Sequence, residues 1–291
     1  MSKSLKQTLL VIAPLTLLCV WAVFSPRTLG AEEEAPGVAE IVDRTNQVAY
    51  YQGKDGKAEV FMTIVDSQNR ERNRRFTILR RDEGPPEEKA DKYGEDEYRG
   101  DQKFYIYFHR PSDVEDMVYL VWKHHEFGED DDRWLYLPDL DLVKRIAASD
   151  KRTSFVGSHF FYEDVSGRNP DNDEHELVET TGNYYVLKNT PKRPDMVEFK
   201  YYKMWIHKDS FVPVQISYYN DRDQEYRKYT VQNVEKIDGY LTITKAKMED
   251  LQSGGHTMLS YDRVKYDRDL PVDIFDNYQR YLRNPPMQYI K

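Results

Sequence analysis

The chain has 291 residues and a formal net charge of −9, with 32% charged and 39% hydrophobic residues. So polar a composition excludes a multi-span membrane protein. The acidic balance argues against a dedicated nucleic-acid binder, which needs a basic face to neutralise phosphates. Aromatic residues make up 13% of the chain and favour strands, so the length predicts one large β domain.

Residues 1–31 have the pattern of a secretory signal peptide. Two early lysines precede Leu9–Phe24, a run of 16 uncharged residues, and the small residues Gly30 and Ala31 supply a cleavage site. An uncleaved anchor is the alternative, but the run is short for the ~30 Å of a bilayer core. Cys19, the only cysteine, lies in this run. We therefore expect an exported mature domain over residues 32–291, without disulfides or thiol chemistry.

The mature chain begins with helical spacing and then changes to strand spacing. Apolar side chains recur at helical intervals from Val38 to Ala49, which predicts a helix that ends near Gly53. From Lys57 the period becomes two, and the polar turn at 67–69 separates two strands of a hairpin.

Further strands are predicted over 104–108, 118–125, 134–137 and 142–146. A long loop follows from Lys151 to Glu176. Five or six strands with short turns then run from Leu177 to Tyr266, one of them over Met196–His207, and helical spacing returns from Ile274 to Leu282. Short turns join antiparallel neighbours. The predicted fold is mainly β with helices (α+β): about ten or eleven antiparallel strands, curled into an unclosed barrel.

The sequence contains no convincing catalytic or metal-binding constellation, so we predict no enzymatic activity and no cofactor. His124 and His125 are adjacent and point to opposite faces of a strand. Asp171 and Asp173 resemble part of a calcium loop but lack its glycine and distal glutamate. Glu163 and Asp164 could form a carboxylate pair, although a solvated acidic loop is the simpler interpretation.

The strands present an aromatic and aliphatic face that could line a lipid-binding cavity. The candidate cavity residues are Val60, Met62, Ile64, Phe104, Ile106, Phe108, Trp122, Trp134 and Tyr136. The same residues could instead fill a dry core, and composition alone does not separate these two possibilities.

A central motif carries a resemblance to a known family. It runs from Asp132 through Trp134-Leu135-Tyr136-Leu137-Pro138 to Asp164 and includes Ser154-Phe155-Val156-Gly157-Ser158-His159-Phe160. With the hairpin at 57–75, the strand-end turn at 108–114 and the closing segment at 275–282, it resembles the outer-membrane lipoprotein-sorting family, the LolA-like periplasmic carriers. The branch associated with RND-type exporters is the most similar. Relatives more often carry Met and Asp at the positions of Val156 and His159.

The resemblance implies an unclosed barrel with a lid of helices and a loop over an apolar cavity. It also implies transport of lipid or lipoprotein acyl chains across the periplasm, with transient membrane contact, a possible RND-type exporter partner and no nucleic acid.

The motif predicts a lid or plug. The candidate residues of this loop are Arg133, Arg145, Ser154, Phe155, Gly157, Ser158, Phe160 and Asp164. We expect either arginine to pair with Asp164 or another acid at the cavity rim. Gly157 and Ser158 permit a tight bend between two aromatic anchors, so the segment could be a mobile lid or a fixed plug. The competing functions are a non-catalytic scaffold of the same fold with a filled core, and an exported hydrolase or lyase, for which His159, Glu163 and Asp164 would have to converge within hydrogen-bond reach.

Overall fold

A computed structural model describes residues 35–84 and 100–291, and Pro36–Lys291 form one compact unit. The predicted signal peptide therefore lies outside the described residues. The first half of this unit contains α1 (Val38–Tyr50), β1 (Asp55–Val65), β2 (Glu71–Asp82), β3 (Gln102–Arg110), β4 (Val118–Lys123), β5 (Asp132–Leu137) and β6 (Leu142–Arg145).

The second half contains α2 (Tyr162–Ser166), β7 (Asp173–Thr180), β8 (Tyr184–Pro191), β9 (Tyr201–His207), β10 (Pro213–Tyr219), β11 (Glu225–Ile237), β12 (Tyr240–Asp250) and β13 (His256–Tyr266). Three short helices close the chain, namely α3 (Asp273–Asp276), α4 (Tyr278–Arg283) and α5 (Met287–Ile290). Single 3-10 turns lie at Pro138–Leu140, Ala148–Asp150, Pro170–Asn172 and Pro194–Met196.

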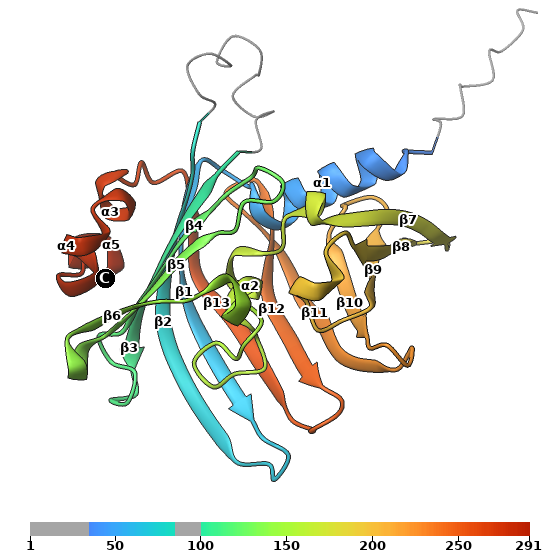
Figure 1. The fold of residues 1–291 in the computed structure, drawn as a ribbon. Helices are drawn as coiled ribbons and strands as arrows, with labels where there is room; N and C mark the ends of the chain where they lie inside the picture. The colour runs from blue at the N-terminus through green and yellow to red at the C-terminus, as the bar shows by residue number, and fades with distance from the viewer. Residues whose placement is uncertain (1–34, 85–99) are drawn as a thin grey trace, which may run out of the picture. The chain divides into compact units, whose positions relative to one another are not determined.

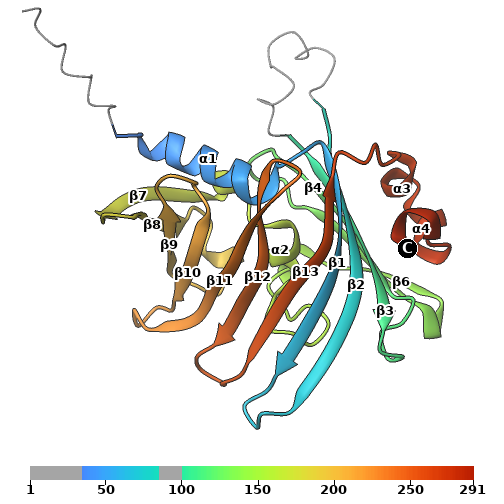
Figure 2. The ribbon, with the colours of Figure 1, turned by 180° about the vertical axis from the view of Figure 1, so that it is seen from behind.

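All 13 strands form one antiparallel sheet in the order β6-β5-β4-β3-β2-β1-β13-β12-β11-β10-β9-β8-β7. Strands β6 and β7 are the two edges, so the sheet is not closed. Figures 1 and 2 show that the strands twist and curve, as sheets of this size must. The predicted fold class, mainly β with helices in an unclosed barrel, is confirmed.

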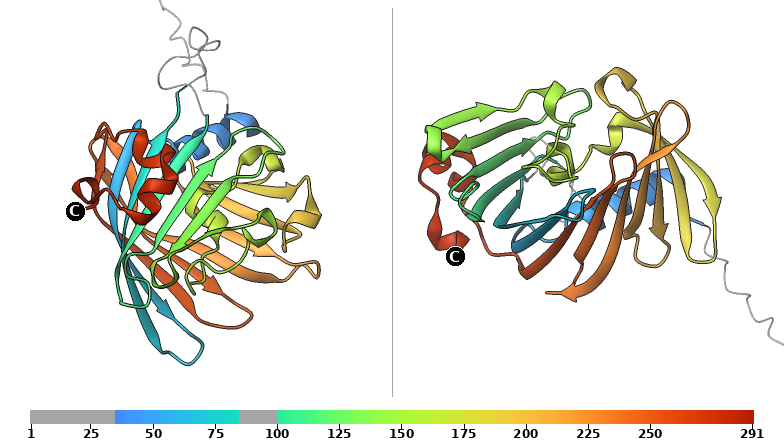
Figure 3. Two further views of the ribbon diagram at one scale, coloured as in Figure 1. Left: turned by 60° about the vertical axis from the view of Figure 1, so that its left-hand side comes forward. Right: turned by 90° about the horizontal axis from the view of Figure 1, so that it is seen from below.

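The sheet is covered by helices on both faces. Helix α1 crosses the concave face near β7–β12, whereas α3–α5 lie outside β3–β6 (Figures 1 and 2). Seen from below, the strands curve around an interior that contains the segment around residues 150–167 (Figure 3, right). The main core cluster combines concave side chains of β1–β5 with Phe155, Phe160 and Tyr162 from this segment.

Three expectations about the elements hold and two do not. Helix α1, the β1–β2 hairpin and the helical C-terminus lie where the spacing predicted them. The sheet has 13 strands, whereas about ten or eleven were predicted. One strand that the prediction missed is β7, which begins within the predicted long loop. Most side chains of this edge strand are exposed, so its sequence shows no apolar alternation. The strand predicted to begin at Met196 begins at Tyr201, after a 3-10 turn.

Candidate functional site

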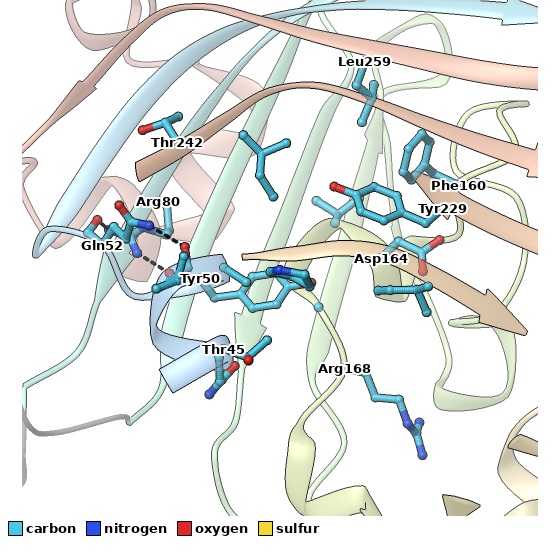
Figure 4. A pocket seen from close by; sticks show the side chains of 18 of the residues that line it. Thr45, Tyr50, Gln52, Arg80, Phe160, Asp164, Arg168, Tyr229, Thr242 and Leu259 are labelled. Atoms are coloured by element: carbon cyan, nitrogen blue, oxygen red, sulfur yellow. Dashed lines mark hydrogen bonds between the residues drawn. The ribbon is translucent and has the colours of Figure 1, made fainter. Parts of the chain in front are cut away.

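An apolar cavity of about 350 Å³ lies between α1 and the concave face of the sheet. Apolar side chains from both sides of the sheet line it, and Figure 4 shows Phe160 and Leu259 at one end and α1 at the other. The apolar lining includes Val42, Val48 and Ala49 of α1, Met62, Phe76, Ile78, Phe104, Phe155, Phe160, Leu187, Met204, Ile206, Ile216, Met248 and Leu259. A volume of this size is within the range of small-molecule sites.

The C-terminal end of α1 is tied to the sheet by hydrogen bonds to its backbone. The guanidinium of Arg80 donates to the carbonyl oxygens of Gln52 and Gly53, both at 2.6 Å, and to that of Tyr50. Gln102 Nε2 donates to the same Tyr50 carbonyl at 2.8 Å. The Tyr50 carbonyl is one that the end of a helix leaves without a partner, and Gln52 and Gly53 lie just beyond that end.

The other end of α1 is held by apolar packing. Ile41 is fully buried against Leu187, Ile206 and Phe211. Between the two attachments, α1 turns small side chains toward the sheet, among them Thr45 and Ala49. Because small side chains cannot reach across the gap, the cavity remains open beneath the helix.

The motif loop closes the cavity on the side of β1–β3. The ring of Phe155 is buried and lies 5.3 Å from Tyr119, 5.8 Å from Phe108 and 6.3 Å from Phe76. Aromatic pairs at such distances stabilise a fold beyond the effect of the apolar area that they bury. Phe160 is also buried and faces Tyr229, with 6.4 Å between the ring centroids.

Hydrogen bonds fix the same loop to three strands. The His159 amide donates to Thr257 Oγ1 at 3.0 Å, and Arg227 donates to the His159 carbonyl at 3.0 Å. Arg72 donates to the Gly157 carbonyl at 3.2 Å. Within the loop, Ser154 Oγ donates to the Ser158 carbonyl at 2.6 Å. Gly157 has φ +76°, a left-handed conformation that favours glycine. These anchors favour the fixed plug over the mobile lid.

A charged cluster borders the cavity beside this plug. Glu163 accepts from Arg152 at 3.0 Å and lies 3.4 Å from Arg168, which also pairs with Asp173 at 2.9 Å. Burial alone would raise the pKa of Glu163, but Arg152 and Arg168 hold it below its usual range. Asp164 is bound by the buried Arg227. The charges of this cluster therefore largely neutralise one another.

Neither predicted arginine pairs with Asp164, and each pairs instead with another acid that does not line the cavity. Arg133 is buried and pairs with Asp131 at 2.5 Å, while Arg145 is exposed and pairs with Asp132. Both arginines belong to β5 or β6, whereas Asp164 faces Arg227 on β11. Sequence proximity within the motif therefore did not identify the contact.

The predicted cavity residues fall into three groups. Met62, Phe104, Phe155, Phe160 and Asp164 line the cavity. Val60, Ile64, Ile106 and Phe108 share the concave face but pack into the core beside it. Trp122, Trp134 and Tyr136 lie on the opposite face.

The placement of this last group corrects the sequence prediction. Trp134 stacks on Tyr278 with 4.8 Å between the ring centroids and contacts Trp122 at 4.8 Å. Since side chains alternate along β5, Leu135 and Leu137 face the concave core instead. Trp134 and Arg145 border a groove on the outer surface.

Sequence reasoning missed all six tyrosines that line the cavity, which are Tyr50, Tyr202, Tyr218, Tyr229, Tyr261 and Tyr266. Tyr50 packs so closely that a Cβ on Gly167 would lie 2.3 Å from its ring, which requires glycine there. Tyr218, Tyr229 and Tyr261 share the concave face with apolar neighbours, and the sheet register brings them together. The high tyrosine content of the later strands was the available signal.

The part of the chain that the structure describes contains no group of histidine, cysteine or acidic residues that could hold a metal ion. The His159 ring bonds to Thr257 at 2.8 Å, while Glu163 and Asp164 bond to arginines. Across residues 35–84 and 100–291, these three candidates for a hydrolase do not hydrogen-bond to one another. No helix in those two ranges is both long and apolar enough to cross a bilayer.

Known proteins share this architecture. A family model described as an uncharacterized protein matches residues 100–284. A DUF1329 family protein from Desulfovibrio piger is 29% identical, with a TM-score of 0.71 over 82% of this chain and 95% of that one. No curated protein matches the chain.

Two further structures match with lower identity. A putative outer membrane lipoprotein-sorting protein domain from Vibrio parahaemolyticus is 23% identical, with a TM-score of 0.71 over 84% of this chain and 97% of that one. A LolA superfamily protein from Nitrosomonas europaea is 20% identical, with a TM-score of 0.61 over 84% of this chain and all (100%) of that one. The chain therefore belongs to the family that the matching model describes, and it has the fold of the LolA-like lipoprotein-sorting proteins that its sequence resembles.

Proposed function

We propose that this protein is a periplasmic carrier that holds the acyl chains of a lipid or lipoprotein in the cavity beneath α1. The observation that carries this proposal is the apolar cavity of about 350 Å³ between α1 and the sheet. Each CH₂ group that enters such a space contributes ~0.8 kcal/mol to binding. A filled scaffold would instead have packed side chains at this position.

The location and the partner belong to the same proposal. The signal-peptide pattern of residues 1–31 supports export to the periplasm. The sequence resemblance supports either lipoprotein sorting or an accessory role beside an RND-type exporter. Recovery of such an exporter with the tagged protein from its native host would support the accessory role, and sorting is expected if it is absent.

A matched pair of substitutions on α1 tests carriage. Ala49 lines the cavity and Ala39 is exposed on the same helix. We expect Ala49→Trp to fill the space and to abolish most uptake of a fluorescent apolar dye, whereas Ala39→Trp leaves uptake unchanged.

The measurement uses the protein purified from the periplasm, with native mass spectrometry for co-purified lipid and fluorescence titration for uptake. Circular dichroism confirms that both variants fold. A wild-type protein that carries no lipid and takes up no probe would support the filled scaffold instead.

A further inference from the structure

Four tyrosines that line the apolar cavity have hydroxyls without a protein partner. Tyr50 comes from α1, Tyr218 from β10, Tyr229 from β11 and Tyr261 from β13, and all four line the cavity. Among the residues that the structure describes, no group hydrogen-bonds to these hydroxyls. Thr45 of α1 is 5% exposed, and its buried Oγ1 also has no partner. Figure 4 shows Thr45, Tyr50 and Tyr229 around the same space.

The other tyrosines around the cavity are satisfied. The Tyr202 hydroxyl donates to Asp173 at 2.8 Å, and that of Tyr266 lies 2.8 Å from Thr242 Oγ1. Buried polar groups in proteins are normally hydrogen-bonded, and each exception needs an explanation. A bound molecule that accepts hydrogen bonds would satisfy the unpartnered hydroxyls.

The four phenols remain protonated donors at neutral pH. Burial raises the pKa of Tyr218 and of Tyr261 to about 12, and it raises those of Tyr50 and Tyr229 further. Carbonyl oxygens accept hydrogen bonds from such donors.

The charges nearby disfavour an anionic group at this position. Asp164 lines the cavity with the four tyrosines, and its negative charge adds to the raised pKa of Tyr50, Tyr218 and Tyr229. Its partner Arg227 and the neighbouring Arg152 are already bound by carboxylates. Lys57 and Lys265 also line the cavity, but they pair across β1 and β13 four residues from Tyr261, roughly 13 Å along the strand. Lys123 Nζ lies 4.8 Å from the centre of the Tyr50 ring, but Lys123 does not line the cavity. A buried carboxylate with no cation beside it is costly, so the polar group that fits beside the phenols is neutral.

Apolar walls lie on both sides of the phenols. Met62, Phe76 and Phe104 line the cavity from β1–β3, while Leu187 and Met204 line it from β8 and β9. In the sheet order, β13 and β11 lie between these two walls. A ligand that fits has a polar group in its middle and an apolar part at each end.

We infer that the phenol cluster, defined as Tyr50, Tyr218, Tyr229 and Tyr261, recognises the carbonyl oxygen of a neutral acyl ester whose apolar chains extend to both sides. This inference rests on the proposed carrier function and specifies the chemical class of its cargo. It also distinguishes the cavity from a purely apolar one, which would bind a hydrocarbon equally well.

Three probes of similar length separate the possibilities. Octyl octanoate has an ester in its middle, heptadecane has no polar group, and palmitate has a carboxylate at one end. Each is delivered from cyclodextrin and competes with a fluorescent apolar dye, phenylnaphthylamine, for the full-length protein. Octyl octanoate is expected to bind about 10-fold more tightly than heptadecane, from one or two hydrogen bonds.

Phenylalanine substitutions remove the hydroxyls while keeping the rings. In the double variant Tyr229→Phe/Tyr261→Phe, we expect octyl octanoate to lose about 10-fold in affinity while heptadecane is unaffected. Tyr266→Phe is the matched control, because its hydroxyl already has a protein partner, and it should leave the ratio of the two affinities unchanged.

The outcomes distinguish the inference from the function on which it rests. If no probe displaces the dye, the carrier proposal fails. If heptadecane or palmitate binds as tightly as the ester, the carrier proposal stands and the ester inference is overturned. An equal loss for ester and hydrocarbon in the double variant would also overturn the inference, since the hydroxyls would then act only through packing.

Discussion

Helices cover both faces of the sheet, but they cover them in different ways. On the outer face, α3–α5 rest directly on aromatic side chains: Phe275 is fully buried, Trp134 stacks on Tyr278, and the Trp122 indole donates to the Phe275 carbonyl at 3.1 Å. On the concave face, α1 presents Thr45 and Ala49 to a cavity of about 350 Å³.

The comparison teaches that side-chain size decides where this fold is solid and where it is hollow. Large rings fill the space between the outer face and its helices, as expected of a close-packed interior. Between Ile41 and Tyr50, α1 presents short side chains such as Thr45 and Ala49 to the curved sheet. They leave space that could receive a cargo. The plug, with Phe155 and Phe160, limits this space on one side.

The largest expected effect comes from matched truncations on the two faces. Phe275→Ala should lower the free energy of unfolding by about 3–5 kcal/mol, because the ring is fully enclosed. Phe160→Ala should cost less, about 2 kcal/mol, because one side of that ring already borders the cavity and has fewer contacts to lose. Urea denaturation of the two variants measures both values. Equal losses would show that the concave face is as solid as the outer one.

The ion pairs of the motif provide a second comparison. Asp164→Asn leaves Arg227, whose side chain is 3% exposed, without its charged partner, and we expect a loss of about 3 kcal/mol. Arg145→Ala breaks a pair in which the arginine side chain is 70% exposed, and we expect a loss below about 1 kcal/mol. The same denaturation experiment compares them. A larger loss at Arg145 would contradict the assignment of Asp164 to the buried cluster.

The last comparison is a pH dependence at the edge of the sheet where β4 ends and β3 and β5 begin. His124 lies 3.2 Å from Asp101 and 3.3 Å from Asp132, and hydrogen bonds to these carboxylates raise its pKa to about 9. Since this pKa exceeds the value of about 6.5 in an unfolded chain, the stabilisation is fully present below about pH 6.5 and is lost as the pH rises through 9. The free energy of unfolding should be measured from pH 6 to 10 (about four units). The difference between wild type and His124→Gln is expected to shrink as the pH rises. A constant difference between them would refute this pKa.

The sequence predicted the elements that have regular spacing and one exposed face. The helix from Val38, the hairpin from Lys57 and the end of β5 before Pro138 all follow from local pattern. Strand β7 was missed because an edge strand with exposed side chains has no apolar alternation. Such a strand is defined by its backbone pairing with β8.

The candidate site was predictable only in part. Met62 and Phe104 were assigned to the cavity from alternation, Phe160 was assigned to the lid or plug from the motif, and all three line the cavity. Alternation also placed Trp134 and Tyr136 on one common face, but it could not say which face was concave. The phenol cluster depends on the register of β10, β11 and β13 and on α1, which no local pattern discloses.

The central claim is that cargo occupies the concave cavity, between α1 and the phenol cluster. A crystal structure of the protein with a fatty ester brominated on one chain tests it directly, because the anomalous signal of bromine locates the ligand. We predict a bromine peak between α1 and the sheet, near Met62 and Phe104 or near Leu187 and Met204. A peak in the outer groove beside Trp134 and Tyr278, or no peak at saturating ligand, would contradict the account.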